Sequence, residues 1–146
     1  MGKNFKRDTV VYQIYPRSYC DSNGDGIGDL RGIISKLDYI ASLGVNAIWL
    51  SPIYESPDDD NGYDISDYQD IMDEFGTMEE FDRLLAAAHE RGIKVILDGV
   101  YSHTGSDSLY FDKNRTFGGE GAYCSQESPY YSWYQWKSWP DSYESW

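Results

Sequence analysis

The hydrophobic and polar positions of this chain follow two alternating patterns over its first hundred residues. Three runs of strand length are rich in β-branched and aromatic residues. Between them, apolar residues recur at the spacing of one helix face. Each helical pattern ends at a glycine, Gly44 or Gly92, after which the next strand begins at once. The predicted order is strand 10–15, helix 30–41, strand 45–50, helix 81–88 and strand 93–97.

The form of these elements predicts an α/β fold with a parallel sheet. Strands that are almost continuously apolar are typical of parallel sheets that are buried on both faces. The helix-to-strand turns are short, whereas a long polar loop at 53–76 follows the second strand, which is the asymmetry of a barrel or a doubly wound fold. Thr77 and Glu80 have the spacing of a capping box. A flavodoxin-like domain is disfavoured, because the Gly-rich loop before the first helix is acidic and would repel phosphate.

The remainder, 104–146, shows no clean helical or strand period. It holds four of the five tryptophans and many of the tyrosines, which is too aromatic for a solvated linker. We interpret it as an irregular subdomain inserted after the third strand.

The composition of the chain excludes some classes of binding partner. The chain has 146 residues and a net charge of -13, which argues against nucleic acid and anionic membranes. The basic N-terminus lacks the apolar core of a signal peptide, and no run reaches membrane-spanning length, so we expect a cytoplasmic location. Cys20 and Cys124 have no spacing that suggests a disulfide framework or a metal site, so both are expected to be reduced.

The acidic loop before the first helix spaces oxygen ligands at alternate positions, as a calcium loop does. Gly32 stands where such loops usually carry a bidentate glutamate, and Asp29 is the alternative closing carboxylate. The other interpretation is a Gly/Asp turn that caps the following helix. The predicted Ca²⁺ ligands are Asp21, Asn23, Asp25, the Ile27 carbonyl and Asp29.

Two further segments carry candidate chemistry. The loop 58–64 places acids and Tyr63 around a Gly turn, which suits a sugar ring and its hydroxyls, although composition alone favours a solvated acidic loop. Asp98 directly follows the third strand and His103 comes five residues later, at the end where α/β folds place their chemistry. A lone histidine is more often structural, and that interpretation also holds for His89.

Eight segments follow one another in a distinctive order along the chain: Val11–Ser18, the acidic loop, Leu43–Val45, Ile48–Pro52, Asn61–Asp64, Asp98–His103, Ser128–Tyr131 and Trp133–Tyr134. In this order they resemble the α-amylase family of glycoside hydrolases (family 13). Up to Gly92 the chain is most similar to oligo-1,6-glucosidases and α-glucosidases, and its tail resembles maltodextrin glucosidases and neopullulanase-type enzymes.

The resemblance implies a (β/α)8 barrel with a small inserted B domain. Residues 1–103 would form the first three strands and two helices of the barrel, and 104–146 part of the B domain. It also implies that Tyr63 stacks on the sugar, that Asp60 and His103 bind its hydroxyls, and that Asp98 anchors the site from below. Ser102 and Gly99 depart from the commonest family residues, and Ser102 puts a second calcium site of classical amylases in doubt.

The resemblance further implies a retaining glycosidase acting on α-1,4 or α-1,6 bonds of maltodextrins or isomalto-oligosaccharides. Such an enzyme needs two carboxyl groups roughly 5 to 5.5 Å apart. In the family they come from the fourth and fifth strands, so we expect both beyond Trp146, and the remaining barrel strands to be needed for a complete fold. The chain alone would then be inactive. The alternative is a truncated, non-catalytic module of the same fold that binds carbohydrate or serves as a scaffold.

Overall fold

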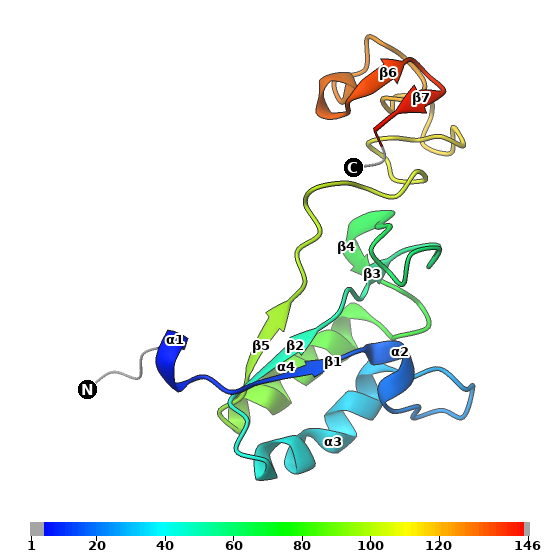
Figure 1. Cartoon of the computed structure of the whole chain (residues 1–146). Coiled ribbons are helices and arrows are strands. Elements are labelled where there is room, and N and C mark those ends of the chain that lie inside the picture. The colour runs from blue at the N-terminus through cyan, green and yellow to red at the C-terminus, as the bar shows by residue number, and fades with distance from the viewer. Residues whose placement is uncertain (1–4, 145–146) are drawn as a thin grey trace. The chain divides into compact units, whose positions relative to one another are not determined.

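The computed structural model describes residues 5–144, which fall into two compact units (Figure 1). The first unit contains the described residues up to Ile53 together with Asp70–Asp98. The second contains Tyr54–Gln69 and the residues from Gly99 onward. The long loop after the second predicted strand therefore belongs mostly to the same unit as the aromatic tail. The domain boundary expected between 103 and 104 stays a prediction.

The first unit is built on a parallel sheet of three strands. They are β1 (Val11–Ile14), β2 (Ala47–Leu50) and β5 (Lys94–Leu97), in the order β1-β2-β5. Ile14 aligns with Leu50, and Leu50 with Leu97, so the carboxyl ends of the strands are level. All three predicted strands are thus confirmed, as is the parallel β-α-β-α-β order.

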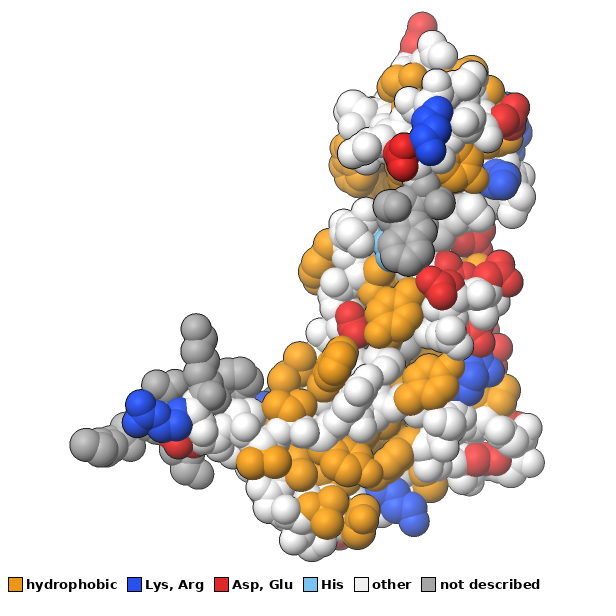
Figure 2. Space-filling model, viewed as in Figure 1, with side chains coloured by type: hydrophobic (Ala, Val, Ile, Leu, Met, Phe, Trp, Pro, Cys, Tyr) orange, Lys and Arg blue, Asp and Glu red, His pale blue; other side chains and the backbone are white. Residues whose placement is uncertain are grey.

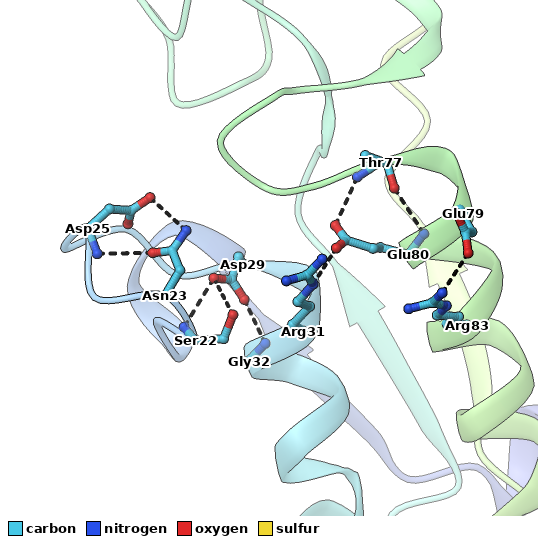
Figure 3. Close-up of polar contacts among 10 residues, drawn as sticks. All are labelled: Ser22, Asn23, Asp25, Asp29, Arg31, Gly32, Thr77, Glu79, Glu80 and Arg83. Carbon is cyan, nitrogen blue, oxygen red and sulfur yellow. Dashed lines mark hydrogen bonds and ion pairs between the residues drawn. The ribbon is translucent and has the colours of Figure 1, made fainter.

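Two long helices connect these strands, α3 (Leu30–Ser42) and α4 (Met78–Glu90). Each buries one apolar stripe in the core of this unit, as the helical spacing predicts. The predicted capping box is present at Thr77 and Glu80. The Glu80 carboxylate also pairs with Arg31 in the first turn of α3, so one buried acid serves both helix starts (Figure 3). No helix among residues 5–144 is long and apolar enough to cross a membrane.

Two single-turn helices were not predicted from the sequence. These are α1 (Phe5–Asp8) and α2 (Pro16–Tyr19). Pro16 ends the first strand, as predicted, and also opens α2, because its fixed φ suits the first helical position. A single turn is too short to show a helical period.

The three strands differ in burial. The middle strand β2 is buried, whereas the outer strands keep Val11 46% and Leu97 38% exposed. Orange hydrophobic side chains are accordingly visible on the face of this unit in Figure 2. The expectation that every strand is buried on both faces is therefore wrong for β1 and β5. Each of them pairs with β2 on one side only, so less of its surface is covered.

The second unit is held together by short strands and packed aromatic rings. β3 (Tyr54–Glu55) pairs with β4 (Asp67–Ile71), whose last two residues belong to the first unit. A 3-10 helix at Tyr131–Trp133 precedes the antiparallel pair β6 (Trp136–Ser138) and β7 (Ser142–Tyr143). The prediction of an irregular, aromatic subdomain fits the tail. The buried Phe111 is its centre and contacts the rings of Tyr123, Tyr134, Trp136 and Tyr143.

Candidate functional site

His103 and Tyr63 are joined directly within the second unit. The Nε2 atom of the histidine lies 2.9 Å from the Tyr63 carbonyl oxygen, and its Nδ1 lies 3.0 Å from the Ser102 hydroxyl. Because a carbonyl oxygen only accepts, Nε2 carries the hydrogen of this contact, and Nδ1 lies within hydrogen-bond distance of the Ser102 hydroxyl. Two segments forty residues apart, both singled out from the sequence, therefore meet here.

The backbone at His103 is fixed by a second tyrosine. Tyr68, on β4, donates its hydroxyl hydrogen to the His103 carbonyl at 2.7 Å. Burial, reinforced by the neighbouring Tyr134, raises the pKa of Tyr68 to about 12, so the phenol keeps its proton at neutral pH. Gly105 N–H donates to the Ile65 carbonyl at 2.8 Å. The segment after β5 is thus tied to the segment that leads into β4.

Asp64 organises the loop that carries Asp60 and Tyr63. Its carboxylate accepts hydrogen bonds from the Ser56 hydroxyl and from the backbone N–H groups of Asp59 and Asp60. Asp60 has an exposed side chain, and its carbonyl accepts from Tyr63 N–H at 3.0 Å. The predicted residues Asp60 and Tyr63 therefore lie in one loop whose shape depends on an acid to which the sequence assigned no role.

A cavity of about 380 Å³ lies beside His103. It shares His103, Thr104, Tyr134 and Glu144 with a second cavity of about 220 Å³. Thr104 and Tyr134 hydrogen-bond to each other through their hydroxyl oxygens at 2.8 Å, and burial raises the pKa of Tyr134. The larger volume lies in the range of small-molecule sites, and its wall mixes aromatic rings with hydroxyl and carboxylate groups. Sequence reasoning missed Thr104, Tyr134 and Glu144; the aromatic bias of the tail was the available signal.

Asp98 occupies the predicted position at the tip of the third strand. It is half-buried and directly follows β5, and it belongs to the first unit. The residues that the second unit brings together are Asp60, Tyr63 and His103. The part of Asp98 in the site thus remains a prediction.

The acidic loop at 21–29 is folded by its own hydrogen bonds (Figure 3). Asp21 accepts backbone N–H groups from Asn23, Gly24 and Gly26 at 2.7–2.9 Å, and the bonds from Gly26 and Gly24 lower its pKa. Asp29 accepts Gly32 N–H at 2.6 Å and is the N-cap of α3. The interpretation as a turn that caps the helix is thereby confirmed for Asp29.

In the structure, the carboxylates of this loop are not gathered around a common point that could hold a metal ion. Within residues 5–144, no group of three or more His, Cys, Asp or Glu side chains is gathered to hold a metal ion. The second oxygen of Asp29 is engaged by Ser22, and Asp25 accepts from Asn23 and from Ile27 N–H. The loop nevertheless presents only oxygen donors, which is the chemistry that Ca²⁺ prefers.

Known proteins resemble this chain over nearly its whole length. Residues 13–144 match the family described as "Alpha amylase, catalytic domain". The oligo-1,6-glucosidase of Bacillus cereus is 56% identical over 94% of the chain, and the glucan 1,6-alpha-glucosidase of Streptococcus pneumoniae serotype 4 is 49% identical over 99%. The solved trehalose-6-phosphate hydrolase of Bacillus licheniformis superposes with a TM-score of 0.84 over 93% of the chain, at 49% identity. The chain spans 23%, 26% and 23% of these three proteins, respectively.

Proposed function

Because the chain belongs to the α-amylase family of catalytic domains, we propose that it supplies the glucose-holding part of an α-glycosidase that cleaves α-glucans. The observation that carries this proposal is the bond between His103 Nε2 and the Tyr63 carbonyl, which brings two candidate sugar-binding segments together. The names of the relatives, oligo-1,6-glucosidase and glucan 1,6-alpha-glucosidase, give the substrate class.

The proposed roles follow from the chemistry of a pyranose, which has a flat apolar face and a rim of hydroxyl groups. The Tyr63 ring would stack on that face, and the exposed Asp60 carboxylate would accept hydroxyl hydrogen bonds. His103, whose ring is already oriented by Tyr63 and Ser102, would contact a further hydroxyl. Asp98 is proposed to take part in binding the sugar as well.

The cleavage step that we propose is retaining hydrolysis of α-1,6 bonds in isomalto-oligosaccharides, with α-1,4 bonds of maltodextrins as the second possibility. It requires a nucleophile and an acid/base, two carboxyl groups roughly 5 to 5.5 Å apart. We propose that these two groups are supplied by residues outside the 146 of this chain. The chain itself would bind and orient glucose.

A chimeric enzyme tests this function. We expect that the Bacillus cereus oligo-1,6-glucosidase, with its 137 aligned residues replaced by those of this chain, still hydrolyses p-nitrophenyl α-glucoside and isomaltose. Asp60→Ala in the chimera should lower kcat/KM for both substrates, because a hydroxyl contact is lost. Initial rates would be compared with those of the intact relative.

The result that would contradict the proposal is a folded chimera, with a cooperative melt, that shows no turnover. If such a chimera still bound isomaltose in calorimetry, the non-catalytic carbohydrate-binding alternative would replace the enzyme. Turnover by the separate 146-residue chain, lost on Asp60→Ala, would overturn the assignment of both carboxyl groups to residues outside it.

We further propose that the loop 21–29 binds Ca²⁺, with Asp21, Asn23, Asp25, the Ile27 carbonyl and Asp29 as the oxygen donors. The lowered pKa of Asp21 keeps its carboxylate charged well below neutral pH, as a calcium ligand must be. Binding would require some of these oxygens to exchange their N–H partners for the ion.

We expect calcium to raise the thermal midpoint of the chain. Stabilisation should reach about 2.7 kcal/mol when free calcium is a hundred times its Kd, because the ion binds only the folded loop. Calorimetric melts in chelator and in calcium would measure it. Asp25→Asn should remove most of the shift, whereas Asp141→Asn, an equal charge change in the second unit, should leave it. Equal midpoints for the wild-type chain with and without calcium would rule the site out.

A further inference from the structure

We infer that Asp64 is the positioning residue of the glucose site, an inference that rests on the proposed function. The Asp64 side chain is half-buried, and its two oxygens are turned to its own loop. One oxygen accepts the Ser56 hydroxyl at 2.9 Å and Asp60 N–H at 3.2 Å, and the other accepts Asp59 N–H at 2.9 Å. Asp64 therefore acts on the sugar through its neighbours.

The geometry requires a carboxylate at this position. Three donors converge on its two oxygens, and a carboxylate offers acceptors at both positions without a hydrogen of its own. An asparagine of the same shape would keep one acceptor and turn an N–H₂ group toward one of the donors. The Ser56 hydroxyl, which is itself buried, also accepts Asp58 N–H at 3.0 Å, so the network extends to the start of the loop.

The bonds to Asp64 also hold an unusual backbone path. Asp58 and Asn61 have left-handed φ values, 61° and 53°, a region that Asp and Asn enter more readily than other residues with a side chain. Surrounding contacts help to hold residues in this region. The Asp64 carboxylate binds the backbone N–H groups of Asp59 and Asp60, which lie between the two left-handed residues.

Asp60 is connected to the other two site residues by a chain of hydrogen bonds. Tyr63 N–H donates to the Asp60 carbonyl at 3.0 Å, and the Tyr63 carbonyl receives His103 Nε2–H at 2.9 Å. Loss of the Asp64 carboxylate would therefore shift Asp60, Tyr63 and His103 together, although no proposed sugar-contacting side chain is removed. A positioning role of this kind predicts a kinetic loss without unfolding.

The test uses Asp64→Asn in the chimera and in the 146-residue chain. In the chimera we expect kcat/KM for p-nitrophenyl α-glucoside to fall about 10- to 100-fold, since small misplacements of binding groups are costly. Asp64→Ala should be worse, and Asp64→Glu should restore part of the loss. Asp67→Asn is the matched control; that side chain is exposed on β4, and its remaining oxygen can still accept Gln69 N–H.

Nuclear magnetic resonance of the ¹⁵N-labelled chain supplies a readout that does not depend on sugar. The Nε2–H proton of His103 should exchange slowly with water in the wild type and at least about tenfold faster in Asp64→Asn, because its acceptor moves. The only other histidine, His89, is exposed on α4 and serves as the internal reference. Melting curves recorded in parallel establish that the variants are folded.

The outcomes separate the two levels of the proposal. An inactive wild-type chimera sinks the proposed function, whereas the exchange of His103 still decides the role of Asp64. Wild-type kinetics or wild-type His103 exchange in Asp64→Asn overturns the inference. Should Asp64→Asn unfold, Ser56→Ala removes a single donor, and we expect a smaller loss in the same direction; an unchanged Ser56→Ala then overturns it.

Discussion

Alanine in place of His103 is expected to lower kcat/KM of the chimeric enzyme for p-nitrophenyl α-glucoside about 100-fold. Two effects combine in this variant. The imidazole contact with a sugar hydroxyl disappears, and the Tyr63 carbonyl loses the Nε2–H donor that holds it at 2.9 Å. The larger share of the loss should come from the second effect, because the Tyr63 ring would no longer be held against the sugar.

His103→Gln separates these contributions. The glutamine amide can still donate to the Tyr63 carbonyl, so its kcat/KM should lie between those of the wild type and His103→Ala. His89→Ala removes the other histidine, which is exposed on α4, and should leave kcat/KM unchanged. Steady-state kinetics of the three variants would measure the effect. A His103→Ala enzyme within twofold of the wild type would show that this histidine has no part in the site.

Gly32→Ala is expected to lower the free energy of unfolding by about 2 to 3 kcal/mol, the cost of overpacking a filled space. A Cβ at this position would lie 1.8 Å from the Cys20 carbonyl oxygen and 2.6 Å from its carbon, both of them backbone atoms. The helix α3 must therefore move away from the segment before the acidic loop. Alanine forms helices better than glycine by about 1 kcal/mol, which offsets only part of this cost.

Urea unfolding of the 146-residue chain, with and without the substitution, measures the difference. Lys36→Ala, on the exposed side of the same helix, controls for the general effect of alanine and should change stability by less than about 0.5 kcal/mol. Gly32→Ala with a stability equal to or above that of the wild type would show that the close approach of Gly32 to Cys20 is not present in solution.

Gly32 also shows where sequence reasoning stopped short. A calcium loop usually carries a closing glutamate at this position, and the sequence alone offers no reason for the glycine. In the structure there is no room for any side chain, because Gly32 packs on the Cys20 carbonyl while its N–H is bound by Asp29. Both facts depend on contacts of Gly32 with Cys20 and Asp29 in the folded chain, and the spacing of residue types in the sequence does not reveal such contacts.

The helices α3 and α4 could be predicted because helical periodicity directly reports one buried face. The strands β1, β2 and β5 could be predicted because each is a run of apolar, β-branched and aromatic residues of strand length. All five elements contribute to the core of the first unit. The pairs β3–β4 and β6–β7 could not be predicted in this way, since these strands of two to five residues show no clear apolar run or period. They depend on pairing and ring packing between separated segments.

The candidate site likewise contains residues that could be assigned from the sequence and one that could not. Asp60, Tyr63 and His103 were assigned sugar-binding roles through the resemblance to the α-amylase family, because composition alone favours a solvated loop and a structural histidine. Asp64 lies in the same segment, but no role could be assigned to it from the sequence, since two of its three partners are backbone N–H groups, which nearly every residue carries. Any residue type except proline can supply the backbone N–H in such a bond, so the partner cannot be recognised from its residue type. A positioning acid of this kind therefore cannot be identified from a single sequence.

The shared acid at the two helix starts has a consequence for how the first unit opens. The Glu80 carboxylate accepts Thr77 N–H and pairs with Arg31, so unwinding the first turn of α4 also removes an ion pair to the first turn of α3. We expect this ion pair to couple the local opening of the two turns. Because Asp29 caps α3 and closes the acidic loop, we expect part of that coupling to reach the loop.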